Sequence, residues 1–329
     1  MNVRRVRLAI VGPQRSTDHA IAPDVGVRWS SVGAELHWYV PTMDDFAGRV
    51  AVITGAASGI GLAYAQCLGR LGMHLVLADI EESALQGAVE QLPTAAPSVL
   101  TVVTDVSDAS SVQDLADRTF AEHRTVHLLC NNAGVSVTRS LLTATSADWT
   151  WMLGVNVWGV IHGVQSFVPT MIERGEPGHV VNTCSIASWT VMPGYGMYST
   201  TKHATAAISE ALLGDLLAVA SPIGVTAVCP SLVRTRLFSS DRNRPNDFDG
   251  HDSGSTDMAE QDRIDAITEG IQTPEDIAEA MIAGVRADRL WVFPNRERLD
   301  IVRRRFDSVL AVPDRARTGP GQTPSRTDR

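Results

Sequence analysis

The sequence predicts an α/β fold: a single domain built on a doubly wound parallel sheet of about seven strands, with helices on both faces. Two observations lead to this prediction. From residue 50 onward, short apolar runs alternate with longer segments whose apolar residues recur every three or four positions, the spacing of a half-buried helix. The short runs are apolar almost throughout, as in strands that helices cover on both faces. This alternation indicates βαβ units.

The elements follow in order along the chain. The predicted strands are residues 50–54, 75–79, 100–104, 128–131, 180–184 and 225–229, with an edge strand at 290–293. The predicted helices are residues 61–72, 81–92, 109–123, 148–174, 198–220 and 274–286. The last helix has Thr273 as its expected N-cap and Pro274 at its first position.

Both ends of the chain and one internal segment depart from this alternation. Residues 1–45 show no sustained period, so we expect an irregular extension, and Met43 is an alternative start of the native product. Residues 46–295 form the predicted domain. Within it, the polar segment 236–270 is expected to be a lid or a mobile surface loop. Residues 296–329 are expected to form an exposed helix and a disordered tail.

Composition disfavours several classes of protein. The net charge of −9 and the pI near 5.5 argue against a nucleic-acid surface. No run approaches the ~18 to 20 apolar residues that cross a membrane, and the apolar stretch 8–11 is too short for a signal peptide. We therefore expect a cytoplasmic protein. The four separated cysteines predict buried thiols, and without HExxH or paired CxxC we expect no metal site.

A glycine-rich loop, TGAASGIG at residues 54–61, joins the first predicted strand to the first helix. Glycines there permit a tight turn and let backbone N–H groups approach a pyrophosphate at the helix N-terminus. The spacing is GxxxGxG rather than GxGxxG, so a plain tight turn is the alternative. The expected cofactor contacts in this loop are Gly55, Ala57, Ser58, Gly59, Ile60 and Gly61.

Asp79 ends the second predicted strand, 18 residues beyond Gly61. An acid at this place can accept hydrogen bonds from the adenosine ribose, and its charge repels the 2′-phosphate of NADP. Ile80 follows it and the glycine loop holds no basic residue, so we predict NAD as the cofactor. An Asp that caps the next helix is the alternative.

Short polar or small motifs follow the third and fourth predicted strands. Asp105 and Val106 stand where a side chain can meet the adenine ring. Asn132, Ala133 and Gly134 permit a close approach of the backbone to a cofactor. Each motif alone is also an ordinary turn signal.

Tyr198 and Lys202 lie four residues apart at the start of a predicted helix, so both project from one face. A nearby cation favours the phenolate form and lowers a tyrosine's pKa towards the working pH. Lys202 is the only Lys among 28 basic residues, which suggests chemistry that a guanidinium cannot perform, although chance retention is the alternative. Ser185 stands thirteen residues before Tyr198, at the end of the fifth strand.

With these motifs in place, the sequence resembles the short-chain dehydrogenase/reductase superfamily in its single-domain oxidoreductase branch. The resemblance covers about residues 46–235 closely and extends weakly to about 293. It implies a Rossmann-like form of the sheet. The supporting motifs are TGAASGIG at 54–61, Asp79, Asp105-Val106, NNAG at 131–134, Asn156, Ser185, Tyr198 with Lys202, and Pro230 with Thr235.

The resemblance implies a role for each matching residue. Tyr198 gives or takes the proton at the alcohol oxygen, and Lys202 lowers its pKa and binds the nicotinamide ribose. Ser185 hydrogen-bonds the substrate oxygen, and Asn156 holds a water that links Lys202 to solvent. The remaining implied cofactor contacts are Pro230, Val233 and Thr235.

Two departures from the family pattern affect these expectations. Ser231 stands where the family usually has Gly after the proline, which narrows the cofactor or substrate space. The C-terminal end lacks the Gly-rich final strand of many tetrameric members. We therefore expect a homodimer formed through the helices 148–174 and 198–220.

The predicted function is the NAD(H)-dependent interconversion of a secondary alcohol and a ketone. A bulky apolar, terpenoid- or steroid-like substrate is expected from the apolar residues that flank the motifs, although a surface loop with buried anchors would look similar. These residues are Trp189, Val191, Met192, Pro193, Tyr195, Leu237 and Phe238.

Two other functions compete with this prediction. A non-catalytic, NAD-sensing regulator is disfavoured because Tyr198 and Lys202 are both present. A sugar-nucleotide epimerase or dehydratase usually carries a TGxxGxxG loop and a larger C-terminal domain, so it is disfavoured as well.

Overall fold

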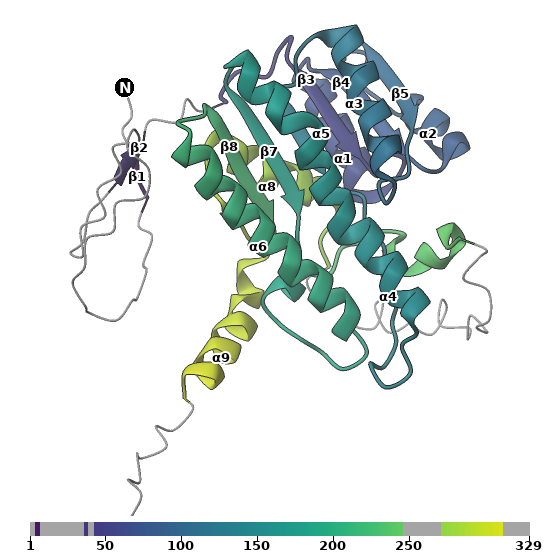
Figure 1. Cartoon of the computed structure of the whole chain (residues 1–329), viewed down its shortest axis with the longest axis vertical. Helices are drawn as coiled ribbons and strands as arrows, with labels where there is room; N and C mark the ends of the chain where they lie inside the picture. The colour runs from purple at the N-terminus through teal and green to yellow at the C-terminus, as the bar shows by residue number, and fades with distance from the viewer. Residues whose placement is uncertain (1–3, 7–35, 39–42, 246–270, 312–329) are drawn as a thin grey trace, which may run out of the picture.

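The computed structural model describes residues 4–6, 36–38, 43–245 and 271–311. Its main sheet has seven strands in the order β5-β4-β3-β6-β7-β8-β9, and every neighbouring pair is parallel (Figure 1). The predicted doubly wound sheet is thus confirmed. The strands are β3 (Val50–Thr54), β4 (His74–Asp79), β5 (Val99–Val103), β6 (Leu128–Asn131), β7 (Gly178–Thr183), β8 (Ile223–Val228) and β9 (Trp291–Val292).

Helices cover both faces of this sheet. One apolar cluster joins Ile53 of β3 to α1, α2 and α8, and a second joins Val52 of β3 to α3, α5 and α6. Successive residues of a strand point to opposite faces, so one strand serves both clusters. The helices are α1 (Gly59–Arg70), α2 (Glu82–Val89), α3 (Ala109–His123), α4 (Ser146–Leu153), α5 (Gly159–Arg174), α6 (Gly196–Ala218), α8 (Pro274–Arg286) and α9 (Leu299–Leu310).

The winding of the chain reverses at β3, which has β4 on one side and β6 on the other. In open parallel sheets, such a switch point leaves a crevice beyond the carboxyl ends of the strands. Gly55 follows β3 and Asn132 follows β6. The topology therefore brings the glycine loop and the NNAG motif to the same edge of the sheet.

Residues 146–174 are helical throughout, as predicted for 148–174, but the helix is not α-helical over its whole length. A π-helical turn, Gly154–Trp158, separates α4 from α5 and carries Asn156 into the interior. Such turns insert a residue into the helical ladder and are frequent at functional sites. Here the buried side-chain amide of Asn156 is satisfied by hydrogen bonds to Val135 and Thr201. These partners lie far from Asn156 in the sequence, so only the folded structure brings them together.

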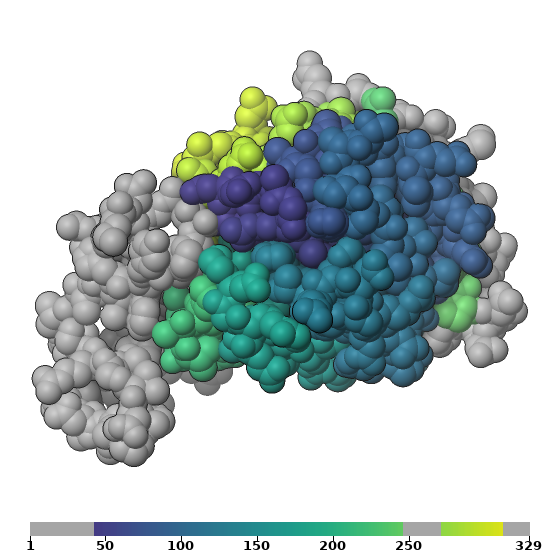
Figure 2. All heavy atoms as spheres, turned by 90° about the horizontal axis from the view of Figure 1, so that it is seen from above, coloured from purple at the N-terminus to yellow at the C-terminus, as the bar shows by residue number. Residues whose placement is uncertain are grey.

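Within the predicted N-terminal extension, β1 (Arg4–Val6) and β2 (Leu36–Trp38) form a short antiparallel pair. The rest of residues 1–42 lies outside the described part, as do 246–270 of the predicted lid and the predicted tail beyond 311. Met43 and Phe46 are buried in the cluster that contains α8, and the Arg286 guanidinium lies 5.3 Å from the centroid of the Phe46 ring. Figure 2 shows this start of the domain beside the C-terminal segments.

Two segments near the C-terminal half border the crevice. A 3-10 helix, η3 (Leu237–Asn243), occupies the beginning of the predicted lid. The predicted exposed helix at 296–305 is a 3-10 turn, η5 (Arg296–Arg298), followed by α9, which buries none of its residues. None of the helices in the described ranges is long and apolar enough to span a membrane.

Candidate active site

A cavity of about 720 Å³ opens at the carboxyl edge of the sheet. Loops after six strands form its walls together with η3 and η5. Three predicted site residues do not line the cavity: Ala57, Gly61 and Asn156. The other predicted site residues all line it. They are Gly55, Ser58, Gly59, Ile60, Asp79, Asp105, Val106, Asn132, Ala133, Gly134, Ser185, Tyr198, Lys202, Pro230, Val233 and Thr235.

The glycine loop and the NNAG motif form one rigid unit. A methyl group on Gly55, whose φ is +64°, would lie 2.8 Å from the Ala133 Cα, so only glycine permits this approach. The Asn132 amide donates to the carbonyls of Thr54 and Gly55 at 3.0 and 3.3 Å. The N-cap of α1, Ser58, makes no side-chain capping bond. The first N–H groups of α1 are therefore available to an anion in the cavity.

Asp79 ties the end of β4 to the glycine loop. Its Oδ2 accepts the Ala57 N–H at 2.9 Å, and its Oδ1 accepts the Glu81 N–H at 3.1 Å. Burial raises the pKa of Asp79, although these backbone hydrogen bonds oppose the rise. Each oxygen can accept a further hydrogen bond from the cavity. The N-cap of α2 is Glu81, so the alternative of Asp79 as that cap is wrong; Asp79 instead fixes the turn before α2 and lines the cavity.

The fold brings arginines to the nucleotide end that the local sequence argument did not consider. Arg242 of η3 donates to Glu81 Oε1 from Nε at 3.0 Å and from Nη2 at 2.7 Å, and Arg236 also lines the cavity. Burial raises the pKa of Glu81, but hydrogen bonds from Asn243 and Arg242 outweigh it and hold the pKa below its usual value. The Glu81 carboxylate therefore already engages the Arg242 guanidinium.

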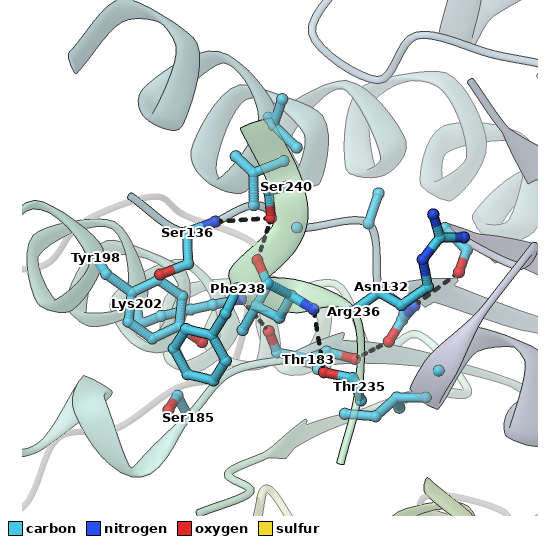
Figure 3. Close-up of a pocket in the computed structure, with 18 of the residues that line it drawn as sticks. Asn132, Ser136, Thr183, Ser185, Tyr198, Lys202, Thr235, Arg236, Phe238 and Ser240 are labelled. Carbon is cyan, nitrogen blue, oxygen red and sulfur yellow. Dashed lines mark hydrogen bonds between the residues drawn. The ribbon is translucent and has the colours of Figure 1, made fainter. Parts of the chain in front are cut away.

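Tyr198, Lys202 and Ser185 converge on the other end of the cavity (Figure 3). Lys202 Nζ lies 5.7 Å from the centroid of the Tyr198 ring and donates to the Thr183 carbonyl at 2.8 Å. The side chain of Ser185 lies close enough to Tyr198 to lower the pKa of its phenol in part. Ser185 Oγ also accepts the Ala187 N–H at 3.1 Å, which fixes it at the start of a 3-10 turn, η2 (Ile186–Ser188).

Burial controls the ionisation of both groups. It raises the pKa of Tyr198 to about 12, although the Ser185 side chain lowers it in part. Burial also lowers the pKa of the Lys202 ammonium. The expected lowering of the Tyr198 pKa by Lys202 is therefore not seen in this geometry, because burial in an apolar wall disfavours the phenolate more strongly.

Asn156 holds three parts of the site together. Its Oδ1 accepts the Val135 N–H at 2.8 Å, and its Nδ2 donates to the Val135 carbonyl at 2.9 Å and to Thr201 Oγ1 at 3.0 Å. A Cβ on Gly134 would lie 3.4 Å from Asn156 Oδ1 and 3.7 Å from Lys202 Nζ. Gly134, which has no side chain, therefore lies beside both the Asn156 amide and the Lys202 ammonium.

The apolar residues predicted for the substrate pocket divide into two groups. Met192, Tyr195, Leu237 and Phe238 line the cavity as expected, and the rings of Tyr195 and Phe238 meet edge to face. The same prediction is wrong for three others, none of which lines the cavity: Trp189, Val191 and Pro193.

Trp189 lies elsewhere because η2 turns the chain immediately before it. Its ring packs edge to face on Trp291 of β9 at 4.8 Å and contacts Phe293 and Phe306. Trp189 therefore anchors the C-terminal segment to the wall of the cavity.

Sequence reasoning missed lining residues that lie far from the motifs or carry ordinary side chains. Ser136 lies two residues after NNAG, and its N–H donates to Ser240 Oγ at 3.2 Å, which joins η3 to the β6 loop (Figure 3). No local signal identifies the others, because only the fold brings them to the cavity. They are Trp151, Thr183, Thr190, Ser240, Arg298 and Ile301.

Comparison with known proteins places this geometry among relatives. The family model described as short chain dehydrogenase matches residues 49–246. The chain is 32% identical over 249 residues to 1-deoxy-11-beta-hydroxypentalenate dehydrogenase of Streptomyces avermitilis, covering 75% of this chain and 84% of that protein. It is 31% identical over 273 residues to a C alpha-dehydrogenase of Sphingobium, covering 82% and 87%. Among solved structures, a short chain dehydrogenase/reductase from Burkholderia phymatum in complex with NAD has 36% identity and a TM-score of 0.77, covering 86% of this chain and 100% of that one.

Proposed function

The chain belongs to the short-chain dehydrogenase/reductase superfamily, and from this membership we propose that it interconverts a secondary alcohol and a ketone with NAD(H). One observation carries the proposal. Tyr198, beside Lys202, lines the same cavity as Ser185, the glycine loop and Asp79. A proton-transfer group and a candidate dinucleotide-binding loop thus line one cavity.

The nucleotide end fits a nicotinamide dinucleotide. The uncapped N-terminus of α1, beside Gly59, suits the pyrophosphate. Asp79 suits the ribose hydroxyls, and together with Glu81 it disfavours the 2′-phosphate of NADP. The relative from Burkholderia phymatum is itself a complex with NAD. When bound, the nicotinamide would accept or supply the hydride at its C4 atom.

The chain's own residues handle the proton and the substrate oxygen. In the oxidative direction, the alcohol C–H bond breaks to give the hydride, the O–H proton passes to Tyr198 Oη, and the C=O bond forms. Ser185 donates a hydrogen bond to the substrate oxygen and steadies its charge. The Lys202 ammonium favours the phenolate, and Asn156 is proposed to hold a water on the proton path beside it. Reduction runs through the same steps in reverse.

The wall beyond Tyr198 supports a bulky apolar substrate. Met192, Leu237, Phe238, Trp151 and Ile301 line that part of the cavity. The similar proteins are dehydrogenases of hydroxypentalenate and of a C alpha position. We therefore propose terpenoid- or steroid-like alcohols as the class to assay first.

Turnover of such alcohols tests the catalytic proposal. We expect NADH formation from a panel that includes borneol and testosterone. Tyr198→Phe should lower the rate by about 10²- to 10⁴-fold, because it removes the proton-transfer group. Tyr195→Phe, which alters another phenol in the same cavity, should change it by less than about tenfold. NAD binding without turnover by the wild-type protein would favour the regulatory alternative instead.

Cofactor choice is tested separately at Asp79. We expect Asp79→Ala to erode the preference for NAD over NADP, because the carboxylate that repels the 2′-phosphate is gone. The ratio of kcat/KM for the two cofactors measures this. A wild-type preference for NADP would contradict the electrostatic argument at the end of β4.

A further inference from the structure

One arginine at the substrate end of the cavity has a guanidinium without an ion-pair partner among the described residues. Arg298 of η5 lines the cavity with Ile301 of α9. Its backbone N–H is bonded to Asn295 Oδ1 at 3.3 Å. Its guanidinium, however, forms no ion pair with any carboxylate in the described part of the chain.

Three other arginines near the cavity are engaged. Arg242 is bonded to Glu81, and Arg244 and Arg139 are both bonded to Asp148. A guanidinium that lines a mainly apolar hollow without an ion-pair partner retains its capacity to bind an incoming anion.

Arg298 belongs to the substrate end rather than the nucleotide end. In the next turns of the same segment, Arg305 Nη1 donates to the Trp189 carbonyl at 2.9 Å, and the Phe306 ring lies 6.2 Å from the Trp189 ring. Trp189 directly precedes Thr190, which lines the cavity on the side of Ser185. The segment that carries Arg298 is therefore tied to the wall where the substrate oxygen would bind.

No carboxylate among the described lining residues lies at that end. The acidic residues that line the cavity are Asp79, Glu81 and Asp105, which follow β4 and β5. The other lining residues include the apolar Ile186, Ala187, Met192 and Leu232. Among the described lining residues that do not follow β4 or β5, an acidic ligand group would therefore meet no carboxylate.

We propose that Arg298 binds a carboxylate of the substrate, so that the substrate class is a bulky apolar hydroxy acid or keto acid. The inference rests on the proposed function and adds an acid group to the proposed substrate. A planar guanidinium matches a carboxylate through two parallel hydrogen bonds. The Asn295 cap and the anchor of Arg305 hold the segment in place, which reduces the entropy lost on binding.

Binding of unreactive acids tests this inference. With NAD present, calorimetry compares 5β-cholanate and 1-adamantanecarboxylate with their primary amides, which have the same shape and no charge. We expect each acid to bind about ten- to a hundredfold more tightly than its amide, as for a hydrogen-bonded charge pair. Arg298→Gln should remove this difference and leave amide binding within about threefold. The control Arg296→Gln, at an exposed arginine of the same turn that does not line the cavity, should retain it.

The outcomes separate this inference from the proposed function. Equal binding of acid and amide in both pairs, no binding of either acid, or an equal loss in Arg296→Gln overturns the role of Arg298. Tyr198→Phe should keep the preference for acids although it cannot turn substrate over. If catalysis is not observed, calorimetry still tests the carboxylate site. If the carboxylate site is disproved, NADH formation still tests catalysis.

Discussion

The two ends of the cavity are built in different ways. At the nucleotide end, the walls are loops that directly follow β3, β4 and β6, and hydrogen bonds of about 3 Å from the side chains of Asp79 and Asn132 to the backbone of the glycine loop join them. At the substrate end, side chains arrive from η3, η5 and α9, which lie far apart in the sequence. The comparison teaches that a site made of backbone turns is specified locally, whereas a site made of side chains from distant segments is specified only by the fold.

The largest expected effect lies where the two ends meet, at Lys202. We expect Lys202→Met to lower alcohol oxidation near neutral pH by about 10²- to 10⁴-fold, because the cation that favours the phenolate is gone. Lys202→Arg should not restore the rate, since a guanidinium does not fit the place of an ammonium bonded to the Thr183 carbonyl. Steady-state rates of NADH formation measure both.

The pH dependence sharpens this test. Burial raises the pKa of Tyr198 to about 12. The phenolate needed for oxidation therefore becomes more abundant as pH rises through the neutral range, while the phenol needed for reduction is already present there. We expect oxidation to speed up with pH and reduction to show no such rise. An oxidation rate independent of pH between 6 and 10 would remove Tyr198 from the proton-transfer step.

The second-largest effect is expected at Asp148, whose ion pairs stabilise the substrate end of the cavity. Asp148 is fully buried, with Arg244 Nη2 at 2.6 Å and Arg139 Nη1 at 3.1 Å from its carboxylate. Removing one partner of a buried ion pair leaves uncompensated charge, so Asp148→Ala should cost about 3–5 kcal/mol of unfolding free energy. Because Arg244 follows η3 and stacks on Trp151, which lines the cavity, KM for the alcohol should rise more than KM for NAD.

The pKa of Asp148 determines how its contribution to the unfolding free energy changes with pH. Burial raises it, but hydrogen bonds from Thr145 and Arg244 outweigh burial and hold the pKa below its usual range. A depressed pKa in the folded state means that the stabilisation is present above the unfolded pKa of about 4 and is lost as pH falls through the folded pKa. Asp148→Asn should remove this acid-dependent part of the unfolding free energy, as denaturant titrations at several pH values would measure.

The same contrast explains what the sequence predicted. Residues 109–123 and 274–286 were predicted as helices with the observed bounds, because their caps are local: Asp108 accepts the Ser110 N–H, and Thr273 forms a capping box with Asp276. The strands are near-continuous apolar runs, so their existence and their shared edge were also predictable.

What escaped prediction depends on distant contacts. The π turn at Gly154–Trp158 exists because Asn156 finds its partners in Val135 and Thr201, and no local pattern reports them. The positions of Trp189 and Arg298 escaped prediction for the same reason. An aromatic residue near the motifs packs on β9, while an arginine some hundred residues later lines the cavity.

Asn156 supplies the third effect. Its amide makes three buried hydrogen bonds at 2.8 to 3.0 Å. We expect Asn156→Ala to cost about 1–3 kcal/mol of unfolding free energy, because buried groups of Val135 lose their partner. If Asn156 also supports the proton path, kcat should fall while KM for NAD changes little. A stability loss with unchanged kcat would restrict Asn156 to a structural role.

The smallest expected effect concerns Arg242, which joins η3 to the nucleotide end through Glu81. Both side chains are partly exposed, at 27% and 24%, so water screens the pair. Exposed ion pairs contribute about 0–1 kcal/mol, and Arg242→Met should change the unfolding free energy by no more than that. Arg244→Met, which breaks the buried pair with Asp148, should cost several times as much. Measured by denaturant titration, equal losses in the two variants would contradict the distinction between the two ends, because η3 would then be held as firmly at the nucleotide end as at the substrate end.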